Sequence, residues 1–279
     1  MRKANLCLHS GANECSMDSV RNSLTPGPTD SHFPIPHEYM VDQVRNTFEE
    51  AGMEIVHEAH ALRRGGQEYF GLLQVDTSGP MWADVAAQDD YCLITGLRNS
   101  HIKSFSAGLC MGSQVFICDN LCFSGQVTIK RKHSRNILRD MPAIINRAVG
   151  QLGCLAEQQE LRLEAYKETR LSDMTVRDFV VRAMEKRVIG CTLIPKVLQE
   201  WHRPRHEEFA EDRNAWRLFN GFTEVLKARG LFDMPERTMG LHALMDLQCG
   251  VPVFKSRDRL GIEAATDVTE DDTIEVAPA

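Results

Sequence analysis

The amino-acid sequence predicts an α+β protein. In this class we expect an N-terminal helix and an antiparallel sheet followed by a helix, then a mostly α-helical C-terminal half and a disordered acidic tail. Between residues 37 and 152, helical apolar patterns enclose several short runs with strand character. From residue 154 to residue 250 only helical patterns recur. Residues 263–279 hold six acidic residues and no basic one, which is typical of disordered segments.

The first predicted element is a helix over residues 37–51. Residues 1–36 are predicted to be irregular, because Pro34 and Pro36 keep the chain extended up to that point. Apolar residues then recur at four-residue spacing, namely Met40, Val44 and Phe48. Gly52 is well placed to end the helix, since glycine readily adopts the left-handed conformation found there.

Five short segments are predicted to be strands of one antiparallel sheet, at residues 54–62, 69–75, 91–97, 114–118 and 126–129. The first two are joined by Arg63-Arg64-Gly65-Gly66, which is typical of a hairpin turn. A helix capped by Ser134 or Asp140 follows the last strand. Its apolar stripe consists of Ile137, Met141, Ile144, Ile145, Ala148 and Leu152, with Pro142 either kinking or opening the helix. We expect helices to cover one face of this sheet.

The C-terminal half is predicted to be a series of helices. A capping-box pattern at Thr175 and Asp178 indicates the start of one helix, and Pro195 can open another. Residues 214–228 and 235–247 complete the series. The predicted divisions are an irregular segment 1–36, an α+β core domain 37–153, a helical region 154–250 and an acidic disordered tail 251–279.

The overall composition argues against several classes of protein. The 279 residues carry a formal net charge of −7, which argues against binding nucleic acid over the whole surface. No apolar run approaches the roughly 18 residues of a membrane span, and residues 1–10 lack the apolar core of a signal peptide. The nine cysteines are irregularly spaced, as expected of reduced thiols. We therefore expect a cytoplasmic protein without a membrane partner.

A local basic cluster stands out on this acidic chain. The window 98–139 contains seven Lys or Arg residues and one acid, Asp119, which gives +6. Such a cluster favours a polyanion ligand, although lysines that protect an exposed strand edge give the same pattern. Cations neutralise phosphates, and Asn, Ser and His side chains add directional hydrogen bonds. The predicted nucleic-acid-binding residues are Arg98, Asn99, Ser100, His101, Lys103, Lys130, Arg131, Lys132, His133 and Arg135.

Two enzymatic alternatives use residues of the same window. Zinc ligands are available in His101, Cys110, Cys118, Cys122 and His133, but their spacing does not follow the paired knuckles of zinc sites. Cys118, Asp119 and Asn120, with His101 or His133, make the residue set of a nucleophilic enzyme. No nucleophile-elbow motif accompanies them, and an Asp-Asn pair is typical of a turn. Phosphate-binding glycine loops are also absent. We therefore predict no metal, no cofactor and no enzymatic activity, and keep a Cys/His-dependent enzyme as an alternative.

Several blocks of the sequence resemble, in the same order, a phage- and plasmid-borne family, the domain-of-unknown-function family nine-three-two. These blocks are residues 34–37, 69–73, 97–101, 115–120, 131–136, 216–224 and 237–242. The resemblance covers the chain up to about residue 250. It implies a mobile-element origin, and hence a bacterial host cytoplasm and a task in replication, recombination or the blunting of host defence.

The helix–sheet–helix layout of residues 37–152 is also similar to single-strand annealing proteins of the Rad-fifty-two type. Those proteins hold single strands in the basic groove of an oligomeric ring, whereas here the window 98–139 alone would have to supply the groove. We predict a phage- or plasmid-encoded protein that binds single-stranded DNA, as a homo-oligomer, in recombination or replication. The alternative from another class is an inhibitor that binds a host defence protein through its acidic tail and helical half.

Overall fold

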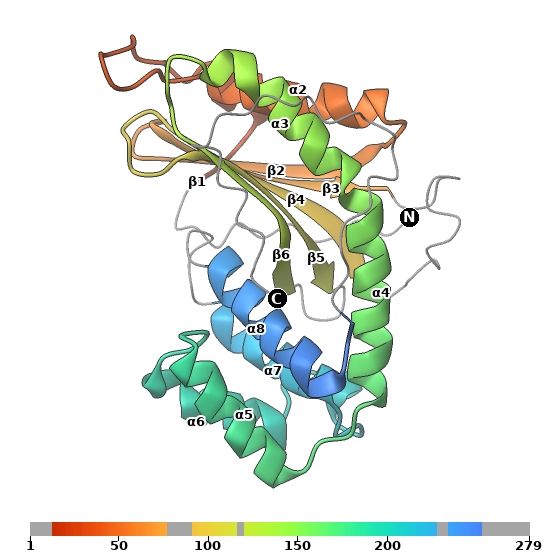
Figure 1. The fold of residues 1–279 in the computed structure, drawn as a ribbon. Coiled ribbons are helices and arrows are strands. Elements are labelled where there is room, and N and C mark those ends of the chain that lie inside the picture. Colours follow the sequence, from red (N-terminus) through yellow and green to blue (C-terminus); the bar gives the residue numbers. More distant parts are fainter. Residues whose placement is uncertain (1–12, 77–90, 116–119, 228–233, 253–279) are drawn as a thin grey trace.

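In the computed structural model, residues 13–76, 91–115, 120–227 and 234–252 are described (Figure 1). They form a six-stranded antiparallel sheet with helices packed on it, which confirms the predicted α+β class. No helix within these ranges is long and apolar enough to cross a membrane. The greater part of the acidic tail lies outside the described residues.

The sheet is a meander in which each strand pairs with its neighbours in the sequence. Its strands are β1 (Asn13–Cys15), β2 (Ile55–Arg63), β3 (Glu68–Val75), β4 (Tyr91–Ser100), β5 (Ala107–Val115) and β6 (Asn120–Arg131). The predicted turn between β2 and β3 is confirmed. Arg64, Gly65 and Gly66 all have positive φ angles, of 52°, 65° and 87°. The two glycines adopt this conformation without the steric penalty of a side chain.

Helices lie on both sides of the sheet (Figure 1). They are α1 (Met17–Arg21), α2 (His37–Glu50), α3 (Ile137–Gly150), α4 (Leu152–Glu168), α5 (Asp173–Glu185), α6 (Ile194–His202), α7 (Ala215–Leu226) and α8 (Met234–Cys249). Short 3₁₀ turns occur at Cys191–Leu193 and Glu207–Phe209. In Figure 1, α2 and α3 lie above the sheet, and α7 and α8 lie below it. The long helix α4 connects the two layers.

Two hydrophobic cores lie on the opposite faces of the sheet, whereas we expected only one covered face. Tyr69 and Leu73 of β3 belong to the core beneath α2 and α3. Phe70 and Leu72, which alternate with them, belong to the core shared with α5–α8. All eight residues of β3 are buried. The unbroken apolar run from Tyr69 to Leu73 is the pattern of a strand covered on both sides, which the expectation of one covered face overlooked.

Other boundaries differ from prediction for identifiable reasons. The strand expected at 114–118 begins at Ala107, because Gly108 and Gly112 hide its strand character, and residues 116–118 lie outside the described residues. The cap of α5 is Ser172, whose Oγ accepts from Thr175 N at 3.1 Å, so the capping-box prediction lies three residues too late. Helix α4 crosses the boundary predicted between 153 and 154. The segment expected to be irregular contains β1 and α1.

Candidate nucleic-acid interface

Three connections of the chain meet at one end of the sheet. The register pairs Glu68 with Ser100 and Ala107 with Arg131, so the β2–β3 turn, the β4–β5 loop and the exit of β6 lie side by side. The N-terminal segment packs against them, since Phe33 N donates to the backbone oxygen of His133 at 2.9 Å. We call this region, residues 31–37, 63–68, 99–107 and 131–136, the sheet end. It contains eight of the ten residues predicted to bind nucleic acid.

Three of the predicted residues are exposed cations, namely Lys103, Lys132 and Arg135. Lys103 Nζ donates to Ser31 Oγ at 2.9 Å, and the Arg135 guanidinium lies 5.8 Å from the ring centroid of Phe33. The same short segment therefore contacts cations that come from two different connections. Within the described part of the chain, no carboxylate pairs with any of the three.

The other strongly basic residue of the β6 exit is neutralised internally. Arg131 is buried, and its Nη2 lies 2.5 Å from Asp140 Oδ2 in the first turn of α3. The exposed Arg139 binds the other carboxylate oxygen at 2.7 Å. Burial raises the pKa of Asp140, but hydrogen bonds and charges from Arg139 and Arg131 outweigh it, so its pKa lies below the ordinary value. Arg131 consequently anchors the strand exit to α3.

A buried carboxylate joins the β2–β3 turn to the β4–β5 loop. The side chain of Glu68 is fully buried and binds Arg63 Nε at 2.5 Å and Arg64 Nε at 3.5 Å. Ser104 Oγ donates to Glu68 Oε1 at 2.7 Å and lies 2.7 Å from Ser100 Oγ. Burial raises the pKa of Glu68, but the hydrogen bonds from Arg63 and Ser104 outweigh it and lower the pKa overall. Ser100 therefore supports the loop that carries Lys103.

Arg98 and Lys130 meet on the opposite side of the sheet, facing α8. Both are paired in register with Gly108, which lies between them on β5. Lys130 Nζ donates to Glu236 Oε1 of α8 at 3.2 Å. The Arg98 guanidinium lies 5.5 Å from the centroid of the Phe105 ring, and burial lowers its pKa. Lys130 is thus paired with α8, and the Arg98 guanidinium packs on Phe105, so neither side chain joins the exposed cations Lys103, Lys132 and Arg135.

Beneath the exposed cations lies a buried network centred on Asn99. Asn99 Nδ2 donates to Ile35 O at 2.9 Å and to His37 Nδ1 at 2.8 Å, and His133 Nε2 donates to Asn99 Oδ1 at 2.7 Å. His101 Nε2 donates to the same Ile35 oxygen at 2.9 Å. The network therefore fixes the N-terminal segment, β4 and the exit of β6 relative to one another.

The histidines of this network are held in the neutral form. His37 Nε2 donates to Gly66 O at 2.9 Å, and His37 Nδ1 accepts a hydrogen bond from Asn99 Nδ2. A proton on Nδ1 would face this N–H donor and would find no acceptor. Burial has the largest effect on the pKa of His37, and the nearby His101 adds to it, so that this pKa is lowered to about 3. Burial is also the main cause for His133, with smaller effects from His32 and His101, and it lowers the pKa of His133 to about 4.

Burial changes the role of five predicted contact residues. The side chains of Asn99, Ser100, His101, Arg131 and His133 are all less than a tenth exposed. These five side chains support the loops from inside, so only the exposed cations are accessible for the predicted contact with nucleic acid. His32 and His37 were missed by the sequence reasoning, although Pro34-Ile35-Pro36-His37 signalled an extended segment that needs a surface to pack on.

The residues proposed for zinc chemistry form no metal site in the described part of the chain, and most of the nucleophilic set falls outside it. No three His, Cys, Asp or Glu side chains there come together as ligands of a metal ion. Burial raises the pKa of the Cys110 thiol to about 12. Cys118 and Asp119 lie outside the described residues, as do the side chains of Asn120 and Cys122.

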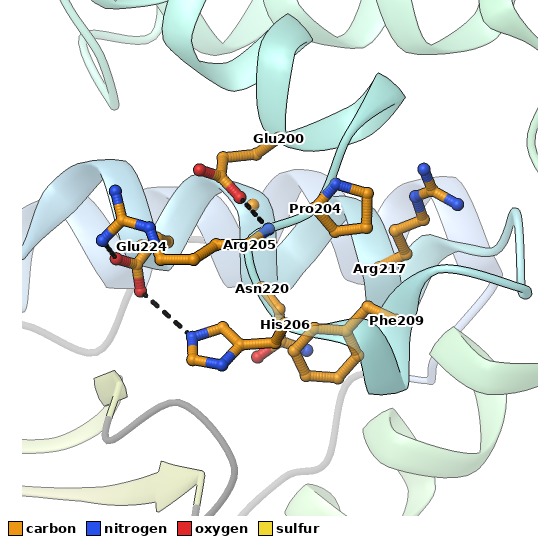
Figure 2. Close-up of a pocket in the computed structure, with 9 residues that line it drawn as sticks. Glu200, Pro204, Arg205, His206, Phe209, Arg217, Asn220 and Glu224 are labelled. Carbon is orange, nitrogen blue, oxygen red and sulfur yellow. Dashed lines mark hydrogen bonds and ion pairs between the residues drawn. The ribbon is translucent and has the colours of Figure 1, made fainter.

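A small pocket lies between α6 and α7. Figure 2 shows Glu224 facing Arg205 and His206 across it. Glu224 Oε1 accepts from Arg205 Nη1 at 2.6 Å, and Glu224 Oε2 lies 2.7 Å from Lys227 Nζ and 3.8 Å from His206 Nε2. The space holds about one water molecule. It is too small for a substrate, and we interpret it as a structural ion-pair cluster.

Comparisons with family models, with curated proteins and with solved structures gave no match. The resemblance to the phage and plasmid family therefore stays a prediction, and the sheet end is the strongest candidate site on its own geometry.

Proposed function

We propose that this protein binds single-stranded nucleic acid, DNA in the first instance, at the sheet end. The observation that carries the proposal is the arrangement of Lys103, Lys132 and Arg135. These exposed cations come from two connections separated in sequence and lie on one buried network. A prepositioned set of cations without internal carboxylate partners is what phosphate contacts require.

The local backbone adds to the positive potential. Helix α3 begins at Ile137, two residues after Arg135, so its N-terminal end and partial positive charge lie beside the cations. The cations protrude from loops, and such an arrangement suits contact with the backbone of a strand more than reading of base edges. A role in annealing during recombination or replication rests on the sequence resemblance alone.

The proposal is tested by the fluorescence anisotropy of a labelled single-stranded oligonucleotide at two salt concentrations. Three phosphate contacts on a single strand give a log–log salt slope of about −2.1. A fourfold increase in salt should therefore weaken binding about 18-fold. The triple variant Lys103→Glu/Lys132→Glu/Arg135→Glu should abolish binding while its circular dichroism spectrum stays native.

A matched control separates the sheet end from the net charge. Lys186, Lys196 and Arg203 are exposed in the helical half, and their reversal to Glu changes the net charge by the same amount. The control variant should keep salt-sensitive binding. Equal losses in the two triple variants, or an affinity unaffected by salt, would overturn the proposal. An RNA strand and a duplex of the same sequence, measured alongside, test the preference for single-stranded DNA.

A further inference from the structure

Helix α5 exposes a stripe of apolar and charged side chains on the outer surface of the helical half. The side chains of Met174 and Val181 are 81% and 46% exposed. They are seven residues apart, close to two helical turns, so they lie on the same face of the helix. Arg177 and Asp178 lie between them on this face and are also exposed. Burial of such a stripe against a partner is favourable if its charges are also matched.

The stripe is complementary to itself in the antiparallel direction. If a twofold axis passes between residues 177 and 178, Met174 of one copy lies opposite Val181 of the other. Arg177 lies opposite Asp178, and the twofold axis repeats both pairs. Each facing pair is thus either apolar with apolar or cation with anion.

We propose that α5 is a self-association surface, through which two copies of this chain pair antiparallel about a twofold axis. The charge complementarity selects a second copy over an unrelated partner, since an arbitrary partner gives no reason for this palindromic order. Asp178 already binds Arg182 Nε at 2.9 Å, but the Asp178 carboxylate is exposed and can turn to a partner at little cost, while Arg182 keeps its bond to Gln248.

The position and size of α5 set the expected strength and independence of the dimer. Its 13 residues span about 20 Å. Pairing through α5 alone therefore buries less area than the roughly 1,200–2,000 Å² of a standard interface. We therefore expect a weak dimer whose population depends on concentration. In Figure 1, α5 and α6 lie at the end of the molecule remote from α2 and α3. Pairing through α5 does not depend on the proposed nucleic-acid binding.

Sedimentation velocity of the full chain over a range of concentrations tests the proposal. Arg177→Glu places Glu opposite Asp178, and Asp178→Lys places Lys opposite Arg177, so each variant alone should weaken the dimer about tenfold or more. An equimolar mixture of the two variants restores an attractive pair at both positions. The mixture should therefore dimerise as well as the wild type.

Leu138→Glu is the matched control, because Leu138 is an exposed apolar residue of α3, away from α5. It should leave the dimer intact. A wild-type chain that stays monomeric at every concentration would overturn the proposal. So would a dimer that neither single variant weakens, or a mixture that stays monomeric while each variant keeps a native circular dichroism spectrum.

Discussion

The imidazole rings of His37 and His101 stack in parallel, with centroids 3.9 Å apart and an angle of 1° between their planes. Each ring donates its Nε2 proton to a backbone oxygen. A second proton on either ring would place a positive charge against its neighbour in a buried site. Burial also lowers the pKa of His101. The stack therefore requires both imidazole rings to be uncharged, and its stability must depend on pH.

We expect the free energy of unfolding to decrease as the pH falls below 6.5. The pKa values of His37 and His133 are about 3 and about 4 in the folded state, below the usual value of 6.5. Between these values and 6.5 the unfolded chain binds more protons, so acid favours unfolding. The stabilisation is complete above 6.5. Each histidine contributes a slope of at most about 1.4 kcal/mol per pH unit.

Urea denaturation at several pH values between about 7.5 and about 5 measures this slope, in a range above the titration of most carboxylates. His37→Gln should remove the contribution of one histidine from the slope, which is at most about 1.4 kcal/mol per pH unit. His202→Gln, at an exposed position, should leave it unchanged. A slope in His37→Gln equal to that of the wild type would show that the buried His37 is not a source of the pH dependence of stability.

Replacement of Asn99 by Asp should destabilise the fold by about 2–4 kcal/mol at neutral pH, because it buries a charge and removes two donors. Ile35 O and His37 Nδ1 would both lose the hydrogen bond from Nδ2. Asn46→Asp, on the exposed surface of α2, makes the same chemical change as a control. Chemical denaturation of both variants measures the difference, and equal stabilities would contradict the role of Asn99.

Helices α4 and α8 are joined by a buried ion pair whose loss should be costly. Arg162 Nη2 lies 2.6 Å from Asp246 Oδ2, and Tyr166 Oη donates to Asp246 Oδ1 at 2.6 Å. Removal of one partner leaves a buried charge, so Asp246→Asn should cost about 3 kcal/mol or more. Arg162→Met/Asp246→Leu should cost less than the sum of its two single variants. An additive double-mutant cycle would rule out coupling between the two residues.

Gly71 of β3 is required by the Tyr69 side chain, which lies over it. A Cβ atom at Gly71 would overlap with the Tyr69 hydroxyl group, which lies 2.9 Å from His60 Nδ1. We expect Gly71→Ala to destabilise the protein by about 1–3 kcal/mol. Gly27→Ala is the control, because no atom lies within 4 Å of its added Cβ. Thermal unfolding distinguishes them, and similar midpoints would refute the overlap.

The sequence carries enough local information to predict most individual elements. The hairpin at Arg63–Gly66, the start of α6 near Pro195 and the start of α7 at Asn214 all follow from turn and capping chemistry that acts over a few residues. β5 was misplaced because its glycines mask the strand pattern, and its pairing with β4 decides the outcome. Tertiary pairing outweighs local preference there.

The sequence predicted where the cations of the candidate site lie in the chain, but not which of them are exposed. The basic cluster at 130–135 lies at the sheet end and is visible in the sequence as charge, while its binding of nucleic acid stays a prediction. The partners of Asn99 are His37 and Ile35, more than 60 residues earlier, and nothing local to either segment signals their contact. Which cations remain available depends on such long-range packing, as the pairing of Lys130 with Glu236 of α8 illustrates.

The meander order of the sheet has a consequence for how the chain folds. From β2 to β6 each strand pairs with the next one in sequence, so these strands can join one after another with only modest loop-closure entropy at each step, whereas β1 joins β2 across α1 and α2. The contact of α8 with β6 is different, since Lys130 and Glu236 are 106 residues apart. We expect the sheet and α2 to form the early folding nucleus, and the docking of α8 to complete the native state late.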